Sequence, residues 1–263
     1  MPDLTSEQAD DWAARLLHAA DEATPIEPLT ESVPGLTIEE AYTIAQRIVG
    51  ARVSRGAKVV GRKIGLTSVA VQQQLGVDEP DFGALLDTMQ LSDGAVVDTS
   101  KFVAPRVELE LAFHMSDSLE GPGVTAKDVR AATESVQPAF ELVDSRIVDW
   151  RIKLADTVAD NASSAGFVLG GDRVTLGDLD VSAVEAVLRH GDKVAETGTT
   201  SAVLGDPCVA VAWLANALGA FGTKLEAGDI VLSGACTRML PARAGDSFTG
   251  DFGRLGSVRL EFV

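Results

Sequence analysis

Alternation of polar and apolar residues identifies one strand with two different faces. From Pro105 to Phe113 the chain reads PRVELELAF, with Arg106, Glu108 and Glu110 at alternate positions and apolar residues between them. Successive side chains of a strand point to opposite sides, so this pattern predicts an apolar face and a charged face. The charged face has two interpretations. It is either a solvated surface or a site for a divalent cation that relieves repulsion between the two carboxylates.

Helical spacing of apolar residues predicts two helices near the N-terminus. Each begins with a capping box, one starting at Thr5 and the other at Thr37, and each carries an apolar stripe. We interpret residues 1–57 as an N-terminal helical cap, with stripes that pack against the rest of the chain or against a neighbouring subunit. Residues 58–263 are then the catalytic domain.

After the cap, the pattern predicts many short strands and few helices. Asp93-Gly94 is typical of tight turns and predicts a hairpin between Leu91 and Val96. The polar residues 156–164 predict a loop. This mixture predicts an α+β fold in which a mixed, largely antiparallel sheet forms a closed or rolled structure. The predicted helices span residues 69–75, 125–136 and 207–218, and the predicted strands span residues 58–64, 138–143, 167–169, 183–188, 193–196, 229–233, 247–252 and 257–262.

Composition narrows the function classes. The chain has 263 residues and a net charge of −17, and no basic cluster is present to meet phosphate, which argues against nucleic-acid and anionic-membrane partners. An anionic substrate must therefore meet a local positive site. Cys208 and Cys236 are too few for a disulfide framework or a cysteine zinc site. The chain shows no N-terminal signal pattern and no apolar run that approaches a membrane span, so we expect a cytoplasmic protein.

Several familiar catalytic motifs do not occur in the sequence. It contains no G-x-S-x-G elbow, no Walker loop and no dinucleotide-binding glycine pattern. The three histidines, His18, His114 and His190, stand at no metal-ligand spacing, which argues against a zinc hydrolase. We predict a structural role for His114, which continues the two-faced strand.

A third glutamate can complete a metal site on the charged face. Glu141 lies between two apolar residues of a predicted strand, where a carboxylate needs a cation, a hydrogen-bond network or a metal. Together with Glu108 and Glu110, it would form an oxygen-ligand site with open positions for water or substrate. The alternative is a salt bridge from Glu141 to Arg106 or Arg146.

Three further side chains are candidates for the chemistry, and each has a plainer alternative. Lys63 can bind a carboxylate or offset developing negative charge, or it is an exposed lysine at a strand end. Asp78, Glu79 and Asp81 crowd one turn, which raises the pKa of one carboxyl and suits a general acid–base; alternatively the turn is solvated and Asp81 is a cap. Ser163 is a hydroxyl donor or an ordinary loop residue.

Five motifs in order along the chain resemble the 2-hydroxypenta-2,4-dienoate (2-keto-4-pentenoate) hydratases of the fumarylacetoacetate hydrolase superfamily. The resemblance runs from about residue 37 to the C-terminus. The motifs are GRKIGLTS at 61–68, QQQLGVDEPDFG at 72–83, PRVELE at 105–110, DTVADNAS at 156–163 and GDIVLSG at 228–234.

The resemblance implies a β-roll fold, a bound Mg²⁺ or Mn²⁺ and a defined set of site residues. It implies metal ligation by Glu108, Glu110 and Glu141, with Lys63 in the site. It also implies that Asp81 acts as acid–base and that Ser163 is a polar contact. The resemblance further implies a homo-oligomer, a pentamer or a decamer, and an association with a decarboxylase or aldolase of the same pathway.

The implied activity is hydration of a small anionic 2-hydroxydienoate, 2-hydroxypenta-2,4-dienoate or a short alkyl homologue, to a 4-hydroxy-2-oxo acid, in meta-cleavage catabolism of aromatic or steroid rings. We hypothesise that the substrate's carboxylate and 2-oxygen bind the cation, that Lys63 offsets dienolate charge, and that Asp81 and Ser163 handle protons as water adds at C4. The alternatives are a 2-oxo-3-hexenedioate (4-oxalocrotonate) decarboxylase, a C–C hydrolase and a non-catalytic partner subunit. The intact Asp78-Glu79-Pro80-Asp81 sequence favours the hydratase.

Overall fold

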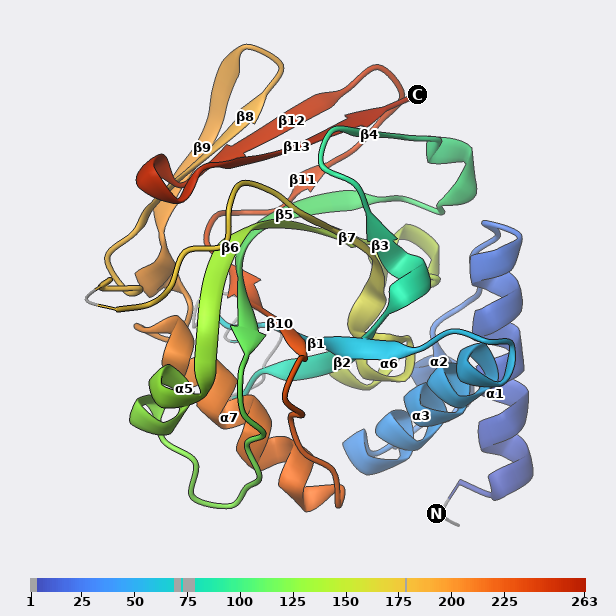
Figure 1. Ribbon diagram of the computed structural model, residues 1–263. Helices are drawn as coiled ribbons and strands as arrows, with labels where there is room; N and C mark the ends of the chain where they lie inside the picture. The colour runs from blue at the N-terminus through green and yellow to red at the C-terminus, as the bar shows by residue number, and fades with distance from the viewer. Residues whose placement is uncertain (1–3, 69–71, 73–78, 178) are drawn as a thin grey trace.

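A rolled sheet, a smaller second sheet and flanking helices make up the protein (Figure 1). The computed structural model describes residues 4–68, 72, 79–177 and 179–263. The helices are α1 (Ser6–Asp21), α2 (Leu29–Ser32), α3 (Ile38–Ser54), α5 (Ala126–Ala132), α6 (Leu154–Ala159) and α7 (Pro207–Ala220), and the 3-10 turns are η1 (Asp87–Met89), η2 (Thr99–Lys101), η3 (Val148–Trp150), η4 (Asn161–Ser163), η5 (Thr200–Ala202) and η6 (Gly253–Leu255).

The larger sheet has eight strands in the order β2-β1-β10-β5-β6-β7-β3, with β11 beside β5. Two of its pairs, β1 with β10 and β3 with β7, are parallel, and the other pairs are antiparallel. Its strands are β1 (Val59–Gly65), β2 (Asp81–Leu86), β3 (Gln90–Leu91), β5 (Arg106–Met115), β6 (Thr133–Val143), β7 (Ser164–Leu169), β10 (Ile230–Ala235) and β11 (Leu240–Pro241).

The smaller sheet has five strands in the order β4-β13-β12-β8-β9 and lies across the outside of β5 and β6 (Figure 1). Its strands are β4 (Ala95–Val97), β8 (Glu185–His190), β9 (Lys193–Thr199), β12 (Ser247–Asp251) and β13 (Ser257–Phe262). The α+β fold with a rolled, mostly antiparallel sheet is therefore as predicted.

The apolar face of β5 packs against this smaller sheet. Leu109 and Phe140 meet β12 at Gly250, where an added Cβ would lie 2.2 Å from Leu109 Cδ1. The chain needs a glycine there because the two sheets approach so closely. Since side chains of a strand alternate, the same packing turns Glu108 and Glu110 toward the inside of the roll.

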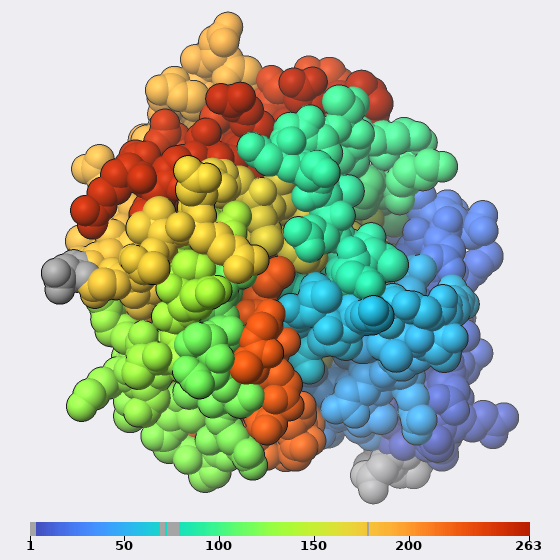
Figure 2. All heavy atoms as spheres, in the orientation of Figure 1, coloured from blue at the N-terminus to red at the C-terminus, as the bar shows by residue number. Residues whose placement is uncertain are grey.

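The N-terminal helices pack onto the rolled sheet and its connections. Trp12, Leu16 and Ile44 form one apolar cluster with Ile147 and Val158 of the main body. In Figure 2 these helices, in blue, lie directly against the cyan atoms of the segment that contains β1. The apolar stripes of the predicted cap are thus buried within the chain, the first of the two alternatives.

Several element boundaries differ from the prediction. The helix predicted to reach Val136 ends at Ala132, because the residues that follow form β6, which pairs with β5 along the whole length of β5. Asp93-Gly94 does not close a hairpin, since β3 pairs with β7 and β4 pairs with β13 in the other sheet. The polar stretch 156–164 contains the end of α6 and the turn η4. The helix predicted at 69–75 falls almost entirely outside the described residues.

The expectation of no apolar run as long as a membrane span is wrong for one segment. Thr200–Ala220 is 21 residues long and contains an 18-residue window with a mean hydropathy of 1.4, so by length and composition it could cross a membrane. Cys208, Val211, Leu214 and Leu218 of this segment are buried in the main apolar core. Packing within the protein therefore accounts for its hydrophobicity.

Candidate active site

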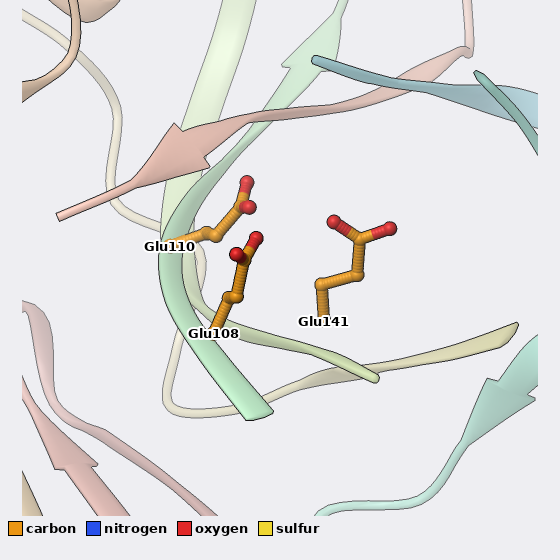
Figure 3. A group of neighbouring side chains, drawn as sticks. All are labelled: Glu108, Glu110 and Glu141. Atoms are coloured by element: carbon orange, nitrogen blue, oxygen red, sulfur yellow. The ribbon is translucent and has the colours of Figure 1, made fainter. Parts of the chain in front are cut away.

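The fold brings three glutamates together inside the roll. Glu108 and Glu110 project from the same face of β5, and Glu141 on β6 is the direct cross-strand partner of Glu108 (Figure 3). One oxygen from each carboxylate lies within 4.8 Å of the others. The period-two pattern of β5 places the first two, and antiparallel pairing with β6 places the third.

This cluster carries a cost that a cation would remove. Glu110 and Glu141 are fully buried, and neither Glu110 Oε1 nor Glu141 Oε1 has a hydrogen-bond partner among the described residues. Burial raises the pKa of Glu110 well above its usual value, and the charges of Glu141 and Glu108 raise it further. Burial also raises the pKa of Glu141 to about 7, although the Lys63 ammonium opposes this. Unpartnered carboxylate oxygens at this spacing fit an oxygen-coordinated divalent cation.

The backbone of β10 orients one of these carboxylates. The amide of Gly234 donates to Glu110 Oε2 at 2.7 Å. Gly234 has a φ of 115°, and an added Cβ would lie 2.3 Å from Thr67 Oγ1. Only glycine fits this position comfortably, and its amide holds one carboxylate of the cluster in place.

Lys63 reaches the cluster from β1 on the other side of the roll. Its Nζ lies 3.3 Å from Glu141 Oε2, and the side chain is 3% exposed. Burial lowers the pKa of Lys63, but the carboxylates of Glu141, Asp81, Glu108 and Glu110 raise it more, so the lysine stays charged. The alternative of an exposed strand-end lysine is excluded.

Gly61, two residues before Lys63 on β1, lies against the backbone of β10. An added Cβ at Gly61 would lie 1.8 Å from the carbonyl oxygen of Ile230. Gly61 therefore permits close parallel pairing of β1 with β10, which carries the Lys63 strand to the glutamates.

Asp81 begins β2 and lies beside Lys63. Its side chain is 2% exposed, and Asp81 Oδ1 has no hydrogen-bond partner among the described residues. Burial raises the pKa of Asp81, and the Lys63 ammonium opposes the rise. The opposing residue Gly65 leaves the space that the carboxyl uses, since an added Cβ would lie 2.1 Å from Asp81 Oδ1. A solvated turn at Asp81 is excluded; Glu79 is exposed, and Asp78 lies outside the described residues.

Ser163 belongs to an unusual left-handed turn. Asn161, Ala162 and Ser163 have φ angles of 54°, 52° and 54°. Such conformations cost non-glycine residues about 1–3 kcal/mol each and concentrate at functional sites. The turn buries Ser163, whose Oγ lies 3.2 Å from Thr157 Oγ1 of α6.

The side chain of Asn161 ties this turn to β2. Its Oδ1 accepts from the amide of Ala84 at 2.8 Å, and its Nδ2 donates to the Ala84 carbonyl at 3.0 Å. Gly83 allows the contact, because an added Cβ would lie 2.5 Å from the Asn161 carbonyl oxygen. Asn161 thus connects the strand of Asp81 with the turn of Ser163.

The two arginines considered as partners for Glu141 lie elsewhere. Arg146 is buried and pairs with Asp160, with 2.6 Å between Nε and Oδ1, and its guanidinium also donates to the Asp160 carbonyl. Arg106 stacks on the Trp150 ring at 4.2 Å. The salt-bridge alternative is wrong in its partner, since the cation beside Glu141 is Lys63.

Comparison with known proteins identifies the family. Residues 58–263 match the family model described as fumarylacetoacetate (FAA) hydrolase C-terminal. This chain belongs to the fumarylacetoacetate hydrolase family. The family membership and the fold predicted from the motifs are therefore confirmed.

Three similar proteins from this family cover almost the whole chain. A 2-hydroxyhexa-2,4-dienoate hydratase from Comamonas testosteroni is 46% identical over 95% of this chain and 95% of its own length. A 2-keto-4-pentenoate hydratase from Paraburkholderia xenovorans (strain LB400) is 44% identical over 98% of this chain and 96% of its own length. The solved structure of 4-oxalocrotonate decarboxylase from Pseudomonas putida G7, complexed with magnesium and adipate, superimposes with a TM-score of 0.98 at 36% identity over all of both chains.

Sequence reasoning about this fumarylacetoacetate hydrolase family member missed residues that support the site. Asn161 and Thr157 lie within the DTVADNAS motif, so the motif itself was a signal for them. As a whole, the site can bind a cation, hold a positive charge beside it and present a buried carboxyl for proton transfer.

Proposed function

We propose that this chain is a divalent-cation-dependent hydratase. Its substrate would be 2-hydroxypenta-2,4-dienoate or a short alkyl homologue, and its product a 4-hydroxy-2-oxo acid. The observation that carries the proposal is the buried carboxyl of Asp81 beside Lys63 and three glutamates, with an Oδ1 that has no hydrogen-bond partner among the described residues. It occurs in a chain that is 46% and 44% identical to two hydratases over nearly their full lengths.

Glu108, Glu110 and Glu141 would hold the cation, which we propose to be Mg²⁺ or Mn²⁺. When bound, it supplies Lewis acidity toward the substrate's carboxylate and 2-oxygen. Lys63, which stays protonated in its cluster of carboxylates, offsets the negative charge that develops on the 2-oxygen. Burial of these groups excludes water and strengthens both interactions.

Asp81 and Ser163 would manage the protons. Asp81 would donate a proton to C5, the far end of the dienol, as the 2-hydroxyl releases its own proton to solvent, which gives a conjugated enone. Water then adds at C4, Asp81 accepts the proton that this water loses and is restored, and C3 takes up a proton from solvent to complete the hydration. The Ser163 hydroxyl, which lies beside Thr157, would orient the water.

The direct test is an assay with 2-hydroxypenta-2,4-dienoate and Mg²⁺. We expect the dienoate absorbance to disappear and a 4-hydroxy-2-oxo acid to form without CO₂. A protein that leaves the dienoate unchanged under metal-saturated conditions would contradict the proposal.

A decarboxylase is the second candidate, because the full-length structural match is a 4-oxalocrotonate decarboxylase. Decarboxylation needs an electron sink and no water-activating acid, so the buried carboxyl of Asp81 favours hydration. Incubation with 2-oxo-3-hexenedioate separates the two, since only a decarboxylase releases CO₂. A non-catalytic subunit, the third candidate, would convert neither compound.

We further propose a cytoplasmic homo-oligomer of five or ten subunits that associates with a decarboxylase or aldolase of the same pathway. Light scattering on the purified chain tests the subunit number, and a monomer would contradict it.

A further inference from the structure

A tyrosine of the helical cap touches the strand that carries Asp81. Tyr42 of α3 is buried, and its hydroxyl accepts a hydrogen bond of 3.2 Å from the amide of Phe82, the residue after Asp81. The rings of Tyr42 and Phe82 stack with centroids 4.3 Å apart. Burial and the charge of Asp81 both raise the pKa of Tyr42, so the phenol keeps its proton beside this carboxyl.

A threonine of the cap touches the helix that leads to Ser163. The amide and hydroxyl of Thr30 donate to the two carboxylate oxygens of Asp156 at 2.9 and 2.8 Å. Asp156 is fully buried in α6 and also accepts from the amide of Lys153 at the start of that helix. The next residue, Thr157, is the hydroxyl neighbour of Ser163.

The cation side of the site is held differently. The described polar contacts of Glu110 and Glu141 come from Gly234 on β10 and Lys63 on β1. Among the described residues, the hydrogen bonds and ion pairs of the three glutamates include no residue of the cap. The cap therefore contacts one half of the site and leaves the other half to the sheet.

We propose that Tyr42 and Thr30 are positioning residues through which the helical cap aligns Asp81 and Ser163, without contributing to cation binding. This rests on the proposed hydratase function, in which Asp81 and Ser163 handle protons. Alignment matters because a displacement of about 1 Å at a reacting group can lower a rate by about a hundredfold.

The test compares Tyr42→Phe and Thr30→Val with wild type, because each removes a hydroxyl and preserves most of the side chain's volume. Thr43→Val is the matched control, since the Thr43 hydroxyl is exposed and, within the described part of the chain, bonds only to the Glu39 carbonyl of α3. Steady-state kinetics give kcat and KM, calorimetry gives the Kd for Mn²⁺, and hydrogen exchange reports on the Phe82 and Ser163 amides.

We expect kcat to fall about tenfold in each variant while KM and the Mn²⁺ Kd stay within about twofold. Exchange should speed up at Phe82 in Tyr42→Phe and at residues 161–164 in Thr30→Val. Thr30→Ser, which keeps the hydroxyl, should restore kcat, and Thr43→Val should match wild type.

Unchanged kcat in both variants would overturn the proposal. Equal loss of kcat and Mn²⁺ affinity would also overturn it, because the cap would then support the whole site. If wild type hydrates no dienoate, the proposed function fails, but hydrogen exchange and Mn²⁺ binding still test the positioning role. Faster exchange of the local amides with an unchanged Kd for Mn²⁺ supports that role, and any other combination overturns it.

Discussion

The two sides of this site are built by different means. The glutamate side stands on adjacent strands, with Glu108 opposite Glu141 in a ladder that runs the length of β5 and β6. The proposed proton-transfer side consists of Asp81 at a strand end and Ser163 in a left-handed turn. Backbone pairing fixes the glutamates and also the start of β2 at Asp81, whereas side chains from distant segments fix the turn of Ser163.

Because of this difference, the side chains of the two sides should differ in how easily they are displaced. A carboxylate on a central strand can shift only if the sheet shifts, and sheets are the most rigid parts of a fold. The turn of Ser163 keeps its strained shape because the side chain of Asn161 binds Ala84 and because Arg146 binds the preceding Asp160. Removal of single side chains should therefore affect the two sides in distinguishable ways.

The largest effect should come from a glutamate. Glu110→Gln removes a proposed ligand, so we expect loss of measurable Mn²⁺ binding by calorimetry and of hydratase activity. In metal-free protein at pH 8 the same change should stabilise the fold by about 1–2 kcal/mol, because it removes a buried charge held among like charges. Urea unfolding with and without metal measures the free energy of unfolding, so it tests both the loss of stabilisation by metal and the gain in stability of the metal-free protein. A variant that binds Mn²⁺ as wild type does would contradict the assignment.

The next largest effect should come from Asp81. Asp81→Asn keeps the shape but cannot exchange protons, so kcat should fall by about 10²–10⁴-fold. Calorimetry should find Mn²⁺ affinity close to that of wild type, since Asp81 is not among the three clustered glutamates. Full hydration activity in this variant, with metal occupancy verified, would remove Asp81 from the mechanism.

The glutamate side was accessible from the sequence because it depends on local periodicity. The alternation around Glu108 and Glu110 specifies their shared face, and the apolar neighbours of Glu141 mark a buried carboxylate. The sequence did not show that the positively charged side chain beside Glu141 is Lys63. Lys63 reaches it only because β1 pairs with β10 and the sheet rolls up, which is a property of the whole fold.

Local sequence offered Asp81 and Ser163 as candidates with plainer alternatives, and the resemblance of the motifs singled them out. Local patterns predict a loop at 156–164, because they do not report the tertiary contacts that hold Asn161 in a left-handed conformation. The same limit explains Asp93-Gly94, where turn chemistry is correct but the two flanking strands join different sheets. Long-range pairing decided each of these outcomes.

A smaller effect should follow from filling the space beside Asp81. In Gly65→Ala the new Cβ would lie 2.1 Å from Asp81 Oδ1 and 3.3 Å from Lys63 Nζ, so the carboxyl must move. We expect kcat to fall by about ten- to a hundredfold. Gly50→Ala in α3 is the matched control, because nothing lies within 4 Å of its added Cβ and alanine favours helix. Equal kinetics in both variants would show that Asp81 tolerates displacement.

The smallest effect should come from His114, at the far end of the glutamate face of β5. Its Nε2 lies 2.8 Å from Gln137 Oε1, and burial, followed by the charge of Arg173, lowers the pKa of His114. A histidine with a lowered folded-state pKa contributes stability above its unfolded pKa of about 6.5, and this contribution is lost as the pH falls through the folded value. Urea unfolding at about pH 5 and about pH 8, roughly the limits between which histidine titrates, gives the free energy of unfolding of wild type and His114→Gln. Between these two pH values, this free energy should change less in the variant than in wild type, by about 1 kcal/mol. Mn²⁺ affinity should be unchanged at pH 8. If the variant instead loses Mn²⁺ affinity, the whole face of β5 supports cation binding and the rigid side extends beyond its three glutamates.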